Sequence, residues 1–302
     1  MKMTIVRHAS MPKSALATAV AALAFLAAAD VGAATTLYSN GFDTYTNGSN
    51  LTSAAGGSWS KDGSGTAAIT TTAGLAESGA GAALLTLPNA TTGTWVYRSN
   101  TLIADPVGSG NAIITSSAGL RIASPASGTA NRSVVLGLQT YDSAVDTIAS
   151  ALLVWDAGNS YGLGTNHLVL QFDWGDGTQD FGYDFGAVTS SQLSSVGYFD
   201  VSVGLNYSTG DITFSWGNTT LGHTFAAEAT HGSFDPTSMS DFSDADLYYA
   251  RAATGGTAPR LLADNYSITT SPAAAVPEPE TWALMLSGLA GVGLLARRRK
   301  PQ

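Results

Sequence analysis

The sequence contains no cysteine, so disulfide bonds do not stabilise its fold. Small secreted domains usually need such cross-links, whereas a chain of 302 residues can bury enough apolar surface to fold without them. Histidine is scarce as well, with four in the whole chain, and no His-x-x-x-His spacing occurs. An ordinary zinc site is therefore not expected.

Positively charged residues are also scarce. Residues 34–275 contain six basic and 19 acidic side chains, a formal charge of −13, and residues 133–250 contain 14 acidic side chains but no Lys or Arg. Nucleic acids attract proteins through cations that replace phosphate counterions, so the sequence predicts no nucleic-acid partner. We interpret most of these carboxylates as a solvated surface that keeps the protein soluble.

Long apolar runs occur only near the two ends of the chain. Near the N-terminus, three basic residues precede the run SALATAVAALAFLAAA, and the small residues VGAA follow it. This layout is typical of a secretory signal peptide over residues 1–33. Cleavage after Ala33 fits the small-residue rule, and cleavage after Ala34 or Ala29 is the alternative. A permanent anchor is not favoured, because spanning a bilayer takes roughly 20 residues.

The C-terminal apolar run, residues 282–296, follows a linker over residues 271–281 that contains a Pro-Glu-Pro motif. As a helix this run would be about 22 Å long, shorter than the roughly 30 Å hydrocarbon core of a membrane. The basic end, residues 297–302, would stay in the cytoplasm and the preceding chain outside. The tail is a poor permanent anchor and has the layout of a processing signal, although a simple tail anchor is the alternative.

The residues with the sorting pattern are Val276, Pro277, Glu278, Pro279, Arg297, Arg298, Arg299 and Lys300. Together with the hydrophobic run between them, they resemble the PEP-CTERM tail of proteins from Gram-negative bacteria. The resemblance implies transient insertion into the inner membrane and recognition by exosortase, a membrane-embedded cysteine protease. It also implies export to the cell surface or extracellular matrix, often in organisms that make exopolysaccharide and biofilm.

Between the two ends, over residues 34–270, helical periodicity is nearly absent and short alternating apolar runs recur. The clearest runs, GYFDVSVGLN and DITFSW, predict a hairpin. Further strands are expected at TTLYS, GTWVYRS, AIITSS, GLRIA, SVVLGLQ, ALLVW, HLVLQFD, DLYYAR and LADNYSITT. Without helical crossovers the strands must pair antiparallel, so we predict a single all-β domain, an antiparallel two-sheet sandwich.

The first and last of these segments, TTLYSNGFDTYTNGSNL and LLADNYSITT, resemble the terminal strands of concanavalin A-like and laminin-G-like jelly rolls. In that fold the terminal strands lie side by side. The resemblance implies a jelly-roll sandwich of a kind that often holds glycans or calcium and often holds neither.

The most suggestive loop lies in QFDWGDGTQDFGYDFG, and its aspartates are Asp173, Asp176, Asp180 and Asp184. Carboxylates from a tight turn suit calcium, although the spacing differs from that of an EF-hand. Asp176-Gly177 is also a hairpin-turn signal, and FDWGDGT resembles the strand-turn signature of polycystic-kidney-disease-type domains. An ordinary turn is the favoured interpretation. We expect no cofactor, with calcium as the one possibility that the sequence raises.

A second acidic loop, HGSFDPTSMSDFSDAD, contains Asp235, Asp241, Asp244 and Asp246. We interpret it as a polar surface connection, with closure over a ligand as the alternative. Glycan binding would need an exposed aromatic ring on a concave face. We expect most tryptophans to lie in the core and Trp174, beside the Gly-rich turn, to be the most exposed and to contact the glycan.

An enzyme is not predicted. Jelly-roll glycosidases of the laminarinase type carry paired glutamates on one strand, whereas Glu77 and Glu228 lie far apart and no Gly-x-Ser-x-Gly elbow occurs. The sequence predicts an exported surface or matrix protein, structural or associated with exopolysaccharide. A calcium-dependent adhesion module is the alternative, and an exported hydrolase of glycans or esters is the third hypothesis.

Overall fold

The computed structural model describes residues 33–54, 59–87, 93–98, 101–124, 133–175, 179–252 and 258–273. Nearly all of them belong to one compact unit, Ala34–Ala273. The predicted signal peptide up to residue 32, the Pro-Glu-Pro motif, the hydrophobic helix and the basic tail lie outside the described residues. Within the described ranges, no helix is long and apolar enough to cross a membrane.

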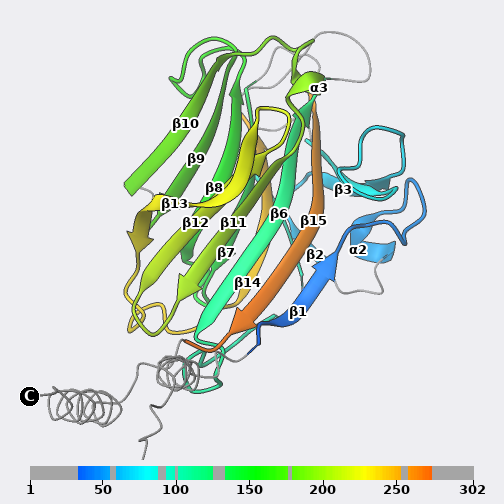
Figure 1. Cartoon of the computed structure of the whole chain (residues 1–302). Helices are drawn as coiled ribbons and strands as arrows, with labels where there is room; N and C mark the ends of the chain where they lie inside the picture. Colours follow the sequence, from blue (N-terminus) through cyan, green and yellow to red (C-terminus); the bar gives the residue numbers. More distant parts are fainter. Residues whose placement is uncertain are drawn as a thin grey trace, which may run out of the picture. The chain divides into compact units, whose positions relative to one another are not determined.

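The domain consists of two antiparallel sheets (Figure 1). The eight-stranded sheet contains β1 (Thr35–Asn40), β3 (Thr66–Thr70), β4 (Ala82–Thr86), β6 (Ile113–Ala123), β11 (Phe199–Asn206), β12 (Asp211–Asn218), β13 (His223–Ser233) and β15 (Arg260–Ser271). The seven-stranded sheet has the order β10 (Gln179–Ala187), β9 (His167–Trp174), β8 (Thr147–Asp156), β7 (Val134–Tyr141), β14 (Asp244–Arg251), β5 (Thr94–Arg98) and β2 (Trp59–Asp62). Two single-turn helices, α2 (Leu51–Ala54) and α3 (Leu193–Val196), lie in connections.

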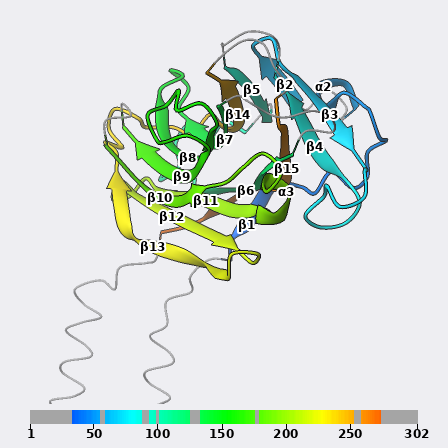
Figure 2. The same cartoon turned by 90° about the horizontal axis from the view of Figure 1, so that it is seen from above.

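The hydrophobic core lies between the two sheets, which Figure 2 shows as two layers. In the central strands every second side chain points into it, because successive side chains point to opposite faces. On β11, for example, Val201 and Val203 are buried while Asp200 and Gly204 are only half-buried. The prediction of an antiparallel two-sheet sandwich is therefore confirmed.

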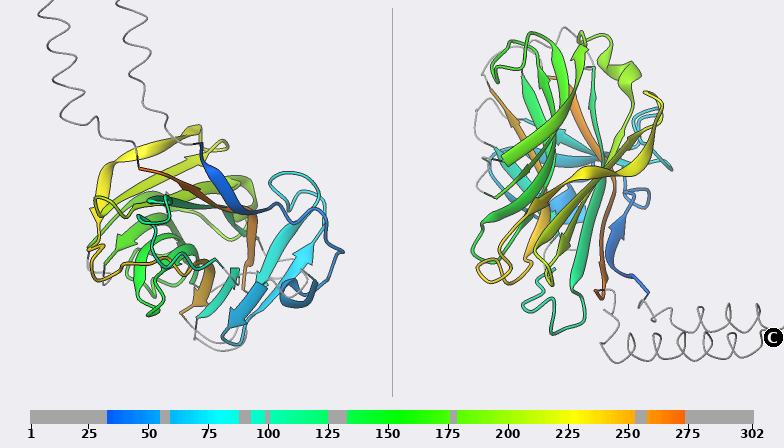
Figure 3. Two further views of the ribbon diagram at one scale, coloured as in Figure 1. Left: turned by 90° about the horizontal axis from the view of Figure 1, so that it is seen from below. Right: turned by 60° about the vertical axis from the view of Figure 1, so that its left-hand side comes forward.

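Two sequence-based predictions of pairing are also confirmed. The strands β11 and β12 form the expected hairpin, with Val203 directly opposite Phe214. The first and last strands lie side by side, with Thr35 opposite Thr270 (Figures 1 and 3). The adjacency of β1 and β15 is the arrangement that the jelly-roll resemblance implied.

Other predictions of strands were wrong. The segments AIITSS and GLRIA form one strand, β6, because it lies between β11 and β15 and pairs with both. The strands β2, β3, β4 and β13 were not predicted. The sequences of β3 and β4, TAAIT and AALLT, are short and rich in alanine, so their alternation is weak. At the edge of its sheet, β13 leaves apolar side chains such as Phe225 exposed.

Candidate functional site

A row of polar side chains crosses the seven-stranded sheet on its outer face, the face turned away from the core. Its members lie directly opposite one another on successive strands: Ser60, Tyr97, Asp246, Gln139, Ser150, Asp173 and Asp180. We call this set the polar row. Neighbouring strands lie about 4.8 Å apart, so the row extends over roughly 29 Å. A row of that length suits an elongated ligand.

Aromatic rings stand beside the polar row where β5, β14 and β7 meet. Trp95 and Tyr248 lie directly opposite each other, with ring centroids 5.3 Å apart. Trp95 Nε1 donates to the Tyr141 hydroxyl at 2.9 Å, and that hydroxyl donates to Gln139 Oε1 at 2.8 Å. These contacts hold Trp95, Tyr141 and Tyr248 as one unit, which we call the aromatic platform. Of the tryptophans that the structure describes, Trp95 is half-buried and the others are buried.

Two carboxyl groups stand beside the platform on the outer face of β14. The side chains of Asp244 and Asp246 hydrogen-bond to each other. Asp246 is 5 % exposed, and its Oδ1 atom has no hydrogen-bond partner among the described residues. Burial raises the pKa of both carboxyls, and the nearby charges of Asp244 and Asp62 raise the pKa of Asp246 further. The pair therefore holds a proton more tightly than an ordinary aspartate does.

A cavity of about 520 Å³ opens further along the polar row. Three members of the row, Gln139, Ser150 and Asp173, line it. The connections before β8 and before β14 complete the lining, with Val145, which is 77 % exposed, and Met239. Because Gln139 also accepts the hydrogen bond from the aromatic platform, the platform and the cavity form one continuous surface.

Trp174 lines the same cavity, but the prediction that it is the most exposed tryptophan was wrong. Its side chain is only 9 % exposed, and its ring packs against those of Phe214 and Phe181, with centroids 5.9 Å and 6.2 Å away. Trp174 follows Phe172 by two residues on β9, so strand alternation sends both rings to the core face. Among the described tryptophans, Trp95 is the most exposed.

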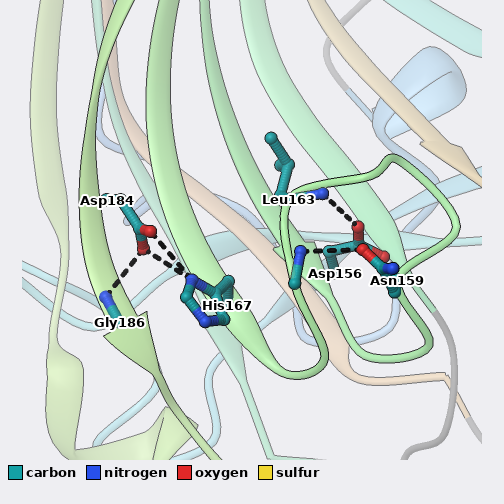
Figure 4. A network of polar contacts seen from close by, with 7 residues as sticks. Asp156, Asn159, Leu163, His167, Asp184 and Gly186 are labelled. Atoms are coloured by element: carbon teal, nitrogen blue, oxygen red, sulfur yellow. Dashed lines mark hydrogen bonds and ion pairs between the residues drawn. The ribbon is translucent and has the colours of Figure 1, made fainter.

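The structure separates the aspartates of the acidic turn. Asp173 and Asp180 lie opposite each other, and Gln171 Nε2 donates to one carboxylate oxygen of each, at 2.7 Å and 3.2 Å. Burial and the charge of Asp180 raise the pKa of Asp173. Asp184 lies further along β10, where its carboxylate contacts His167 Nδ1 at 2.8 Å (Figure 4).

The calcium prediction is untested by this geometry. Asp176, the aspartate at the centre of the predicted turn, lies outside the described residues. Among the residues that are described, no group of three or more His, Asp or Glu side chains is placed to hold a metal ion. The strands on both sides of the turn do form the expected antiparallel pair, β9 and β10.

Asp156, at the end of β8, organises the loop over residues 157–166 (Figure 4). Its buried carboxylate accepts hydrogen bonds from the Ser133 hydroxyl and from the N–H groups of Ser160, Tyr161 and Leu163. Burial opposes its ionisation, but these four hydrogen bonds outweigh burial and lower the pKa of Asp156. The loop carries Tyr161, and burial together with the charges of Tyr248 and Asp156 raises the pKa of this tyrosine to about 12.

The two glutamates considered for catalysis, and His223, lie apart from this face. Glu77 lies against the eight-stranded sheet, beside Asp200. Glu228 accepts a hydrogen bond from the Tyr183 hydroxyl at 2.6 Å, and the His223 ring stacks on Trp216 with centroids 3.6 Å apart. The two glutamates do not form a pair.

Sequence reasoning missed the aromatic platform and Gln139. The signal was present in TWVYR, where alternation places Trp95 and Tyr97 together on the face opposite the buried Val96. It was also present at the end of the second acidic loop, where Asp244 and Asp246 belong to β14 rather than to a surface connection. Asp235 and Asp241 do lie in the connection between β13 and β14.

Comparisons with known proteins add one family match. Residues 275–300 match the family described as the PEP-CTERM protein-sorting motif. No curated protein matches the chain. Similar solved structures include lectin II from Ulex europaeus (12 % identity, 79 % of this chain and 100 % of that chain, TM-score 0.43). An endo-1,3-β-glucanase from Streptomyces sioyaensis has 12 % identity over 78 % of this chain and 96 % of that chain, with a TM-score of 0.47.

The fold and the tail together define the class of protein. The domain is a jelly-roll β-sandwich by its own strand order and pairing. The tail carries the sorting motif, which implies an exported bacterial protein that is processed by exosortase.

Proposed function

We propose that the exported domain is a cell-surface or extracellular-matrix protein that holds exopolysaccharide on the outer face of its seven-stranded sheet. The observation that carries this proposal is the aromatic platform of Trp95, Tyr141 and Tyr248, hydrogen-bonded to Gln139 of the polar row. Ligand sites combine aromatic surface with a few positioned polar groups. Sugar rings present both kinds of surface, since their C–H faces are apolar and their hydroxyls form hydrogen bonds.

The dimensions of the face support a polymer rather than a monosaccharide. The polar row runs across all seven strands, and the cavity of about 520 Å³ lies on the same line as the platform. A chain lying across the strands would meet the platform first and the cavity next, with Gln139 between them. Several weak contacts along one chain would then act together.

The carboxyl groups on this face support binding rather than hydrolysis. Glycosidases need two carboxyl groups about 5 Å to 9.5 Å apart, so that the sugar carbon or a water molecule fits between them. Asp244 and Asp246 instead hydrogen-bond directly to each other. We therefore propose that this pair does not act as the acid and base of a glycosidase.

A calcium-dependent adhesion module is the second candidate. The observation in its favour is that Asp173 and Asp180 lie directly opposite each other beside the predicted turn, with the pKa of Asp173 raised. Their shared contact with Gln171 weakens this candidate, because the amide already compensates both carboxylates.

Retention of the full chain, purified in detergent, on immobilised exopolysaccharide tests the proposal. We expect Trp95→Ala to weaken retention about tenfold, which corresponds to about 1.4 kcal/mol of binding free energy. Phe225→Ala is the matched control, because Phe225 is 51 % exposed but belongs to the eight-stranded sheet. If the folded Trp95→Ala variant bound as well as the unchanged protein, this face would not be the binding site.

A further inference from the structure

The five Lys and Arg residues that the structure describes all direct their charge away from the outer face. Lys61 Nζ donates to the backbone carbonyls of Gly63 and Gly65, and the guanidinium of Arg98 lies over the Tyr38 ring. Arg251 is 4 % exposed and has the strand parity of the core residues Leu247 and Tyr249, so it points to the core face of β14. The remaining two, Arg121 and Arg260, belong to strands of the eight-stranded sheet, where they donate to backbone carbonyls.

The outer face of the seven-stranded sheet carries carboxyl groups both at the aromatic platform and at the cavity. Asp62 lies opposite Trp95, next to the Asp244–Asp246 pair, and Asp146 and Asp173 line the cavity. The buried Oδ1 atom of Asp246 has no hydrogen-bond partner at any described residue. Burial raises the pKa of Asp173, Asp244 and Asp246, so these carboxyls resist ionisation in the free protein, and a cation bound beside them would favour their ionised form.

These groups select for a ligand that donates hydrogen bonds and carries positive charge. Ionised carboxylates only accept hydrogen bonds, so they pair with hydroxyl and ammonium groups. A uronate would bring its own carboxylate against like charge, which costs binding energy. An ammonium group near the rings of Trp95 and Tyr248 would also gain from the attraction between a cation and an aromatic face.

We propose that this face prefers polysaccharides with free amino groups, such as partly de-N-acetylated hexosamine chains, over uncharged and uronate-containing chains. The inference rests on the proposed function and specifies the chemical class of its ligand. Acetylation of the amine removes both the charge and two of the donors, so it should remove most of the preference.

Isothermal titration of the full chain in detergent tests the preference. The probes are a β-1,4-linked glucosamine hexamer, its fully N-acetylated counterpart and an oligogalacturonate of the same length. We expect the glucosamine oligomer to bind at least tenfold more tightly than the acetylated one, with an affinity that falls as salt is added. The oligogalacturonate should bind the most weakly. Equal affinity for the three probes would refute the preference.

Two substitutions identify the carboxylates responsible. Asp62→Asn and Asp173→Asn should each reduce the preference for the glucosamine oligomer over the acetylated one about threefold. Asp211→Asn is the matched control, because Asp211 is an exposed carboxylate on β12 of the other sheet. If Asp211→Asn reduced the preference as much as the two substitutions on the outer face, the net charge of the protein rather than this face would explain the preference.

Competition by spermine separates a sugar site from general attraction of cations. Spermine carries ammonium groups but no sugar ring, so it should compete weakly with the glucosamine oligomer. If spermine displaced the bound glucosamine oligomer as effectively as an equal concentration of free oligomer does, the proposed preference for amino sugars would be refuted. Binding of all three sugars with equal affinity, still lost in Trp95→Ala, would leave the proposed function standing. If no sugar bound, both proposals would fail.

Discussion

Asp264, in the middle of β15, accepts hydrogen bonds from the backbone N–H groups of Glu77 and Ser78, at 2.9 Å and 3.2 Å. This contact fastens a segment between β3 and β4 to the outer face of the eight-stranded sheet. It also brings the Glu77 carboxyl against Asp200. Burial, the contact with Asp200 and the charge of Asp264 together raise the pKa of Glu77 to about 8.

Stability should therefore fall as the pH rises from 5 to 9. Glu77 binds its proton more tightly in the folded state than in the unfolded state, where its pKa is near 4.5. Its contribution is full below that value and is lost as the pH approaches 8. Glu77→Gln mimics the protonated acid, so at pH 9 we expect it to be more stable than the unchanged protein by on the order of 1–2 kcal/mol, after allowance for partial exposure.

Urea denaturation at several pH values measures this effect. The decrease between pH 5 and pH 9 should be smaller in Glu77→Gln, with a remainder from the Asp244–Asp246 pair, whose raised pKa acts in the same direction. Asp211→Asn serves as an exposed control on β12. An unchanged pH dependence in Glu77→Gln would show that Glu77 does not hold the proton.

Asp156→Asn should destabilise the domain by about 2–3 kcal/mol at pH 7, because charge-assisted hydrogen bonds to three N–H groups and one hydroxyl are weakened. The pKa of Asp156 is lowered in the folded state, so its contribution is present above about 3.8 and is lost as the pH falls further. The difference in stability between the two proteins should therefore narrow as the pH falls below about 3.8. Asp105→Asn removes the charge from a carboxylate that accepts from Gly108 N–H, and should cost less than 1 kcal/mol.

Phe214→Ala should cost about 3–5 kcal/mol of unfolding free energy. Phe214 is fully buried, and its ring lies 5.0 Å from that of Phe172 and 5.8 Å from that of Phe181. Phe225→Ala removes the same group from an exposed position and should change stability by less than about 0.5 kcal/mol. Guanidinium denaturation measures both. Similar losses in the two variants would contradict the packing of this core.

Calcium should change the melting temperature of the full chain by less than about one degree. Calcium requires six to eight oxygen ligands, whereas Asp184 contacts His167 and Gly186 N–H, and Asp173 and Asp180 share Gln171. Thermal melts with calcium and with chelator measure the difference. A rise of several degrees, abolished by Asp176→Ala, would establish the adhesion module instead, because a ligand bound only by the folded state raises stability.

Much of the fold could be predicted from alternation, because alternation is what burial of one sheet face imposes on a strand. GYFDVSVGLN and DITFSW showed it clearly, and their hairpin is present. The edge strand β13 could not be predicted in this way, since exposed Phe225 obscures the pattern of its segment. The order of the strands depends on contacts between distant segments, which local patterns do not specify.

The candidate site was harder to predict, because the register of distant strands creates it. Ser60 and Asp246 stand in one row only because both lie opposite Tyr97. Sequence reasoning did not single out Trp95, since composition alone cannot tell the two faces of a strand apart. Trp174 was expected to be exposed because of its neighbouring glycines. It lies two residues after the core residue Phe172 on the same strand, so its side chain points to the core face as well.

The pairing of β15 determines how the domain would bear tension. This strand pairs with β6 along nearly its whole length and with β4 and β1 on its other side. Hydrogen bonds between antiparallel strands lie perpendicular to them. A pull on the chain beyond Ser271, directed along β15, would load these bonds together in shear instead of opening them one at a time. The strand that leads to the sorting tail is thus the one best held against being drawn out of the domain by force.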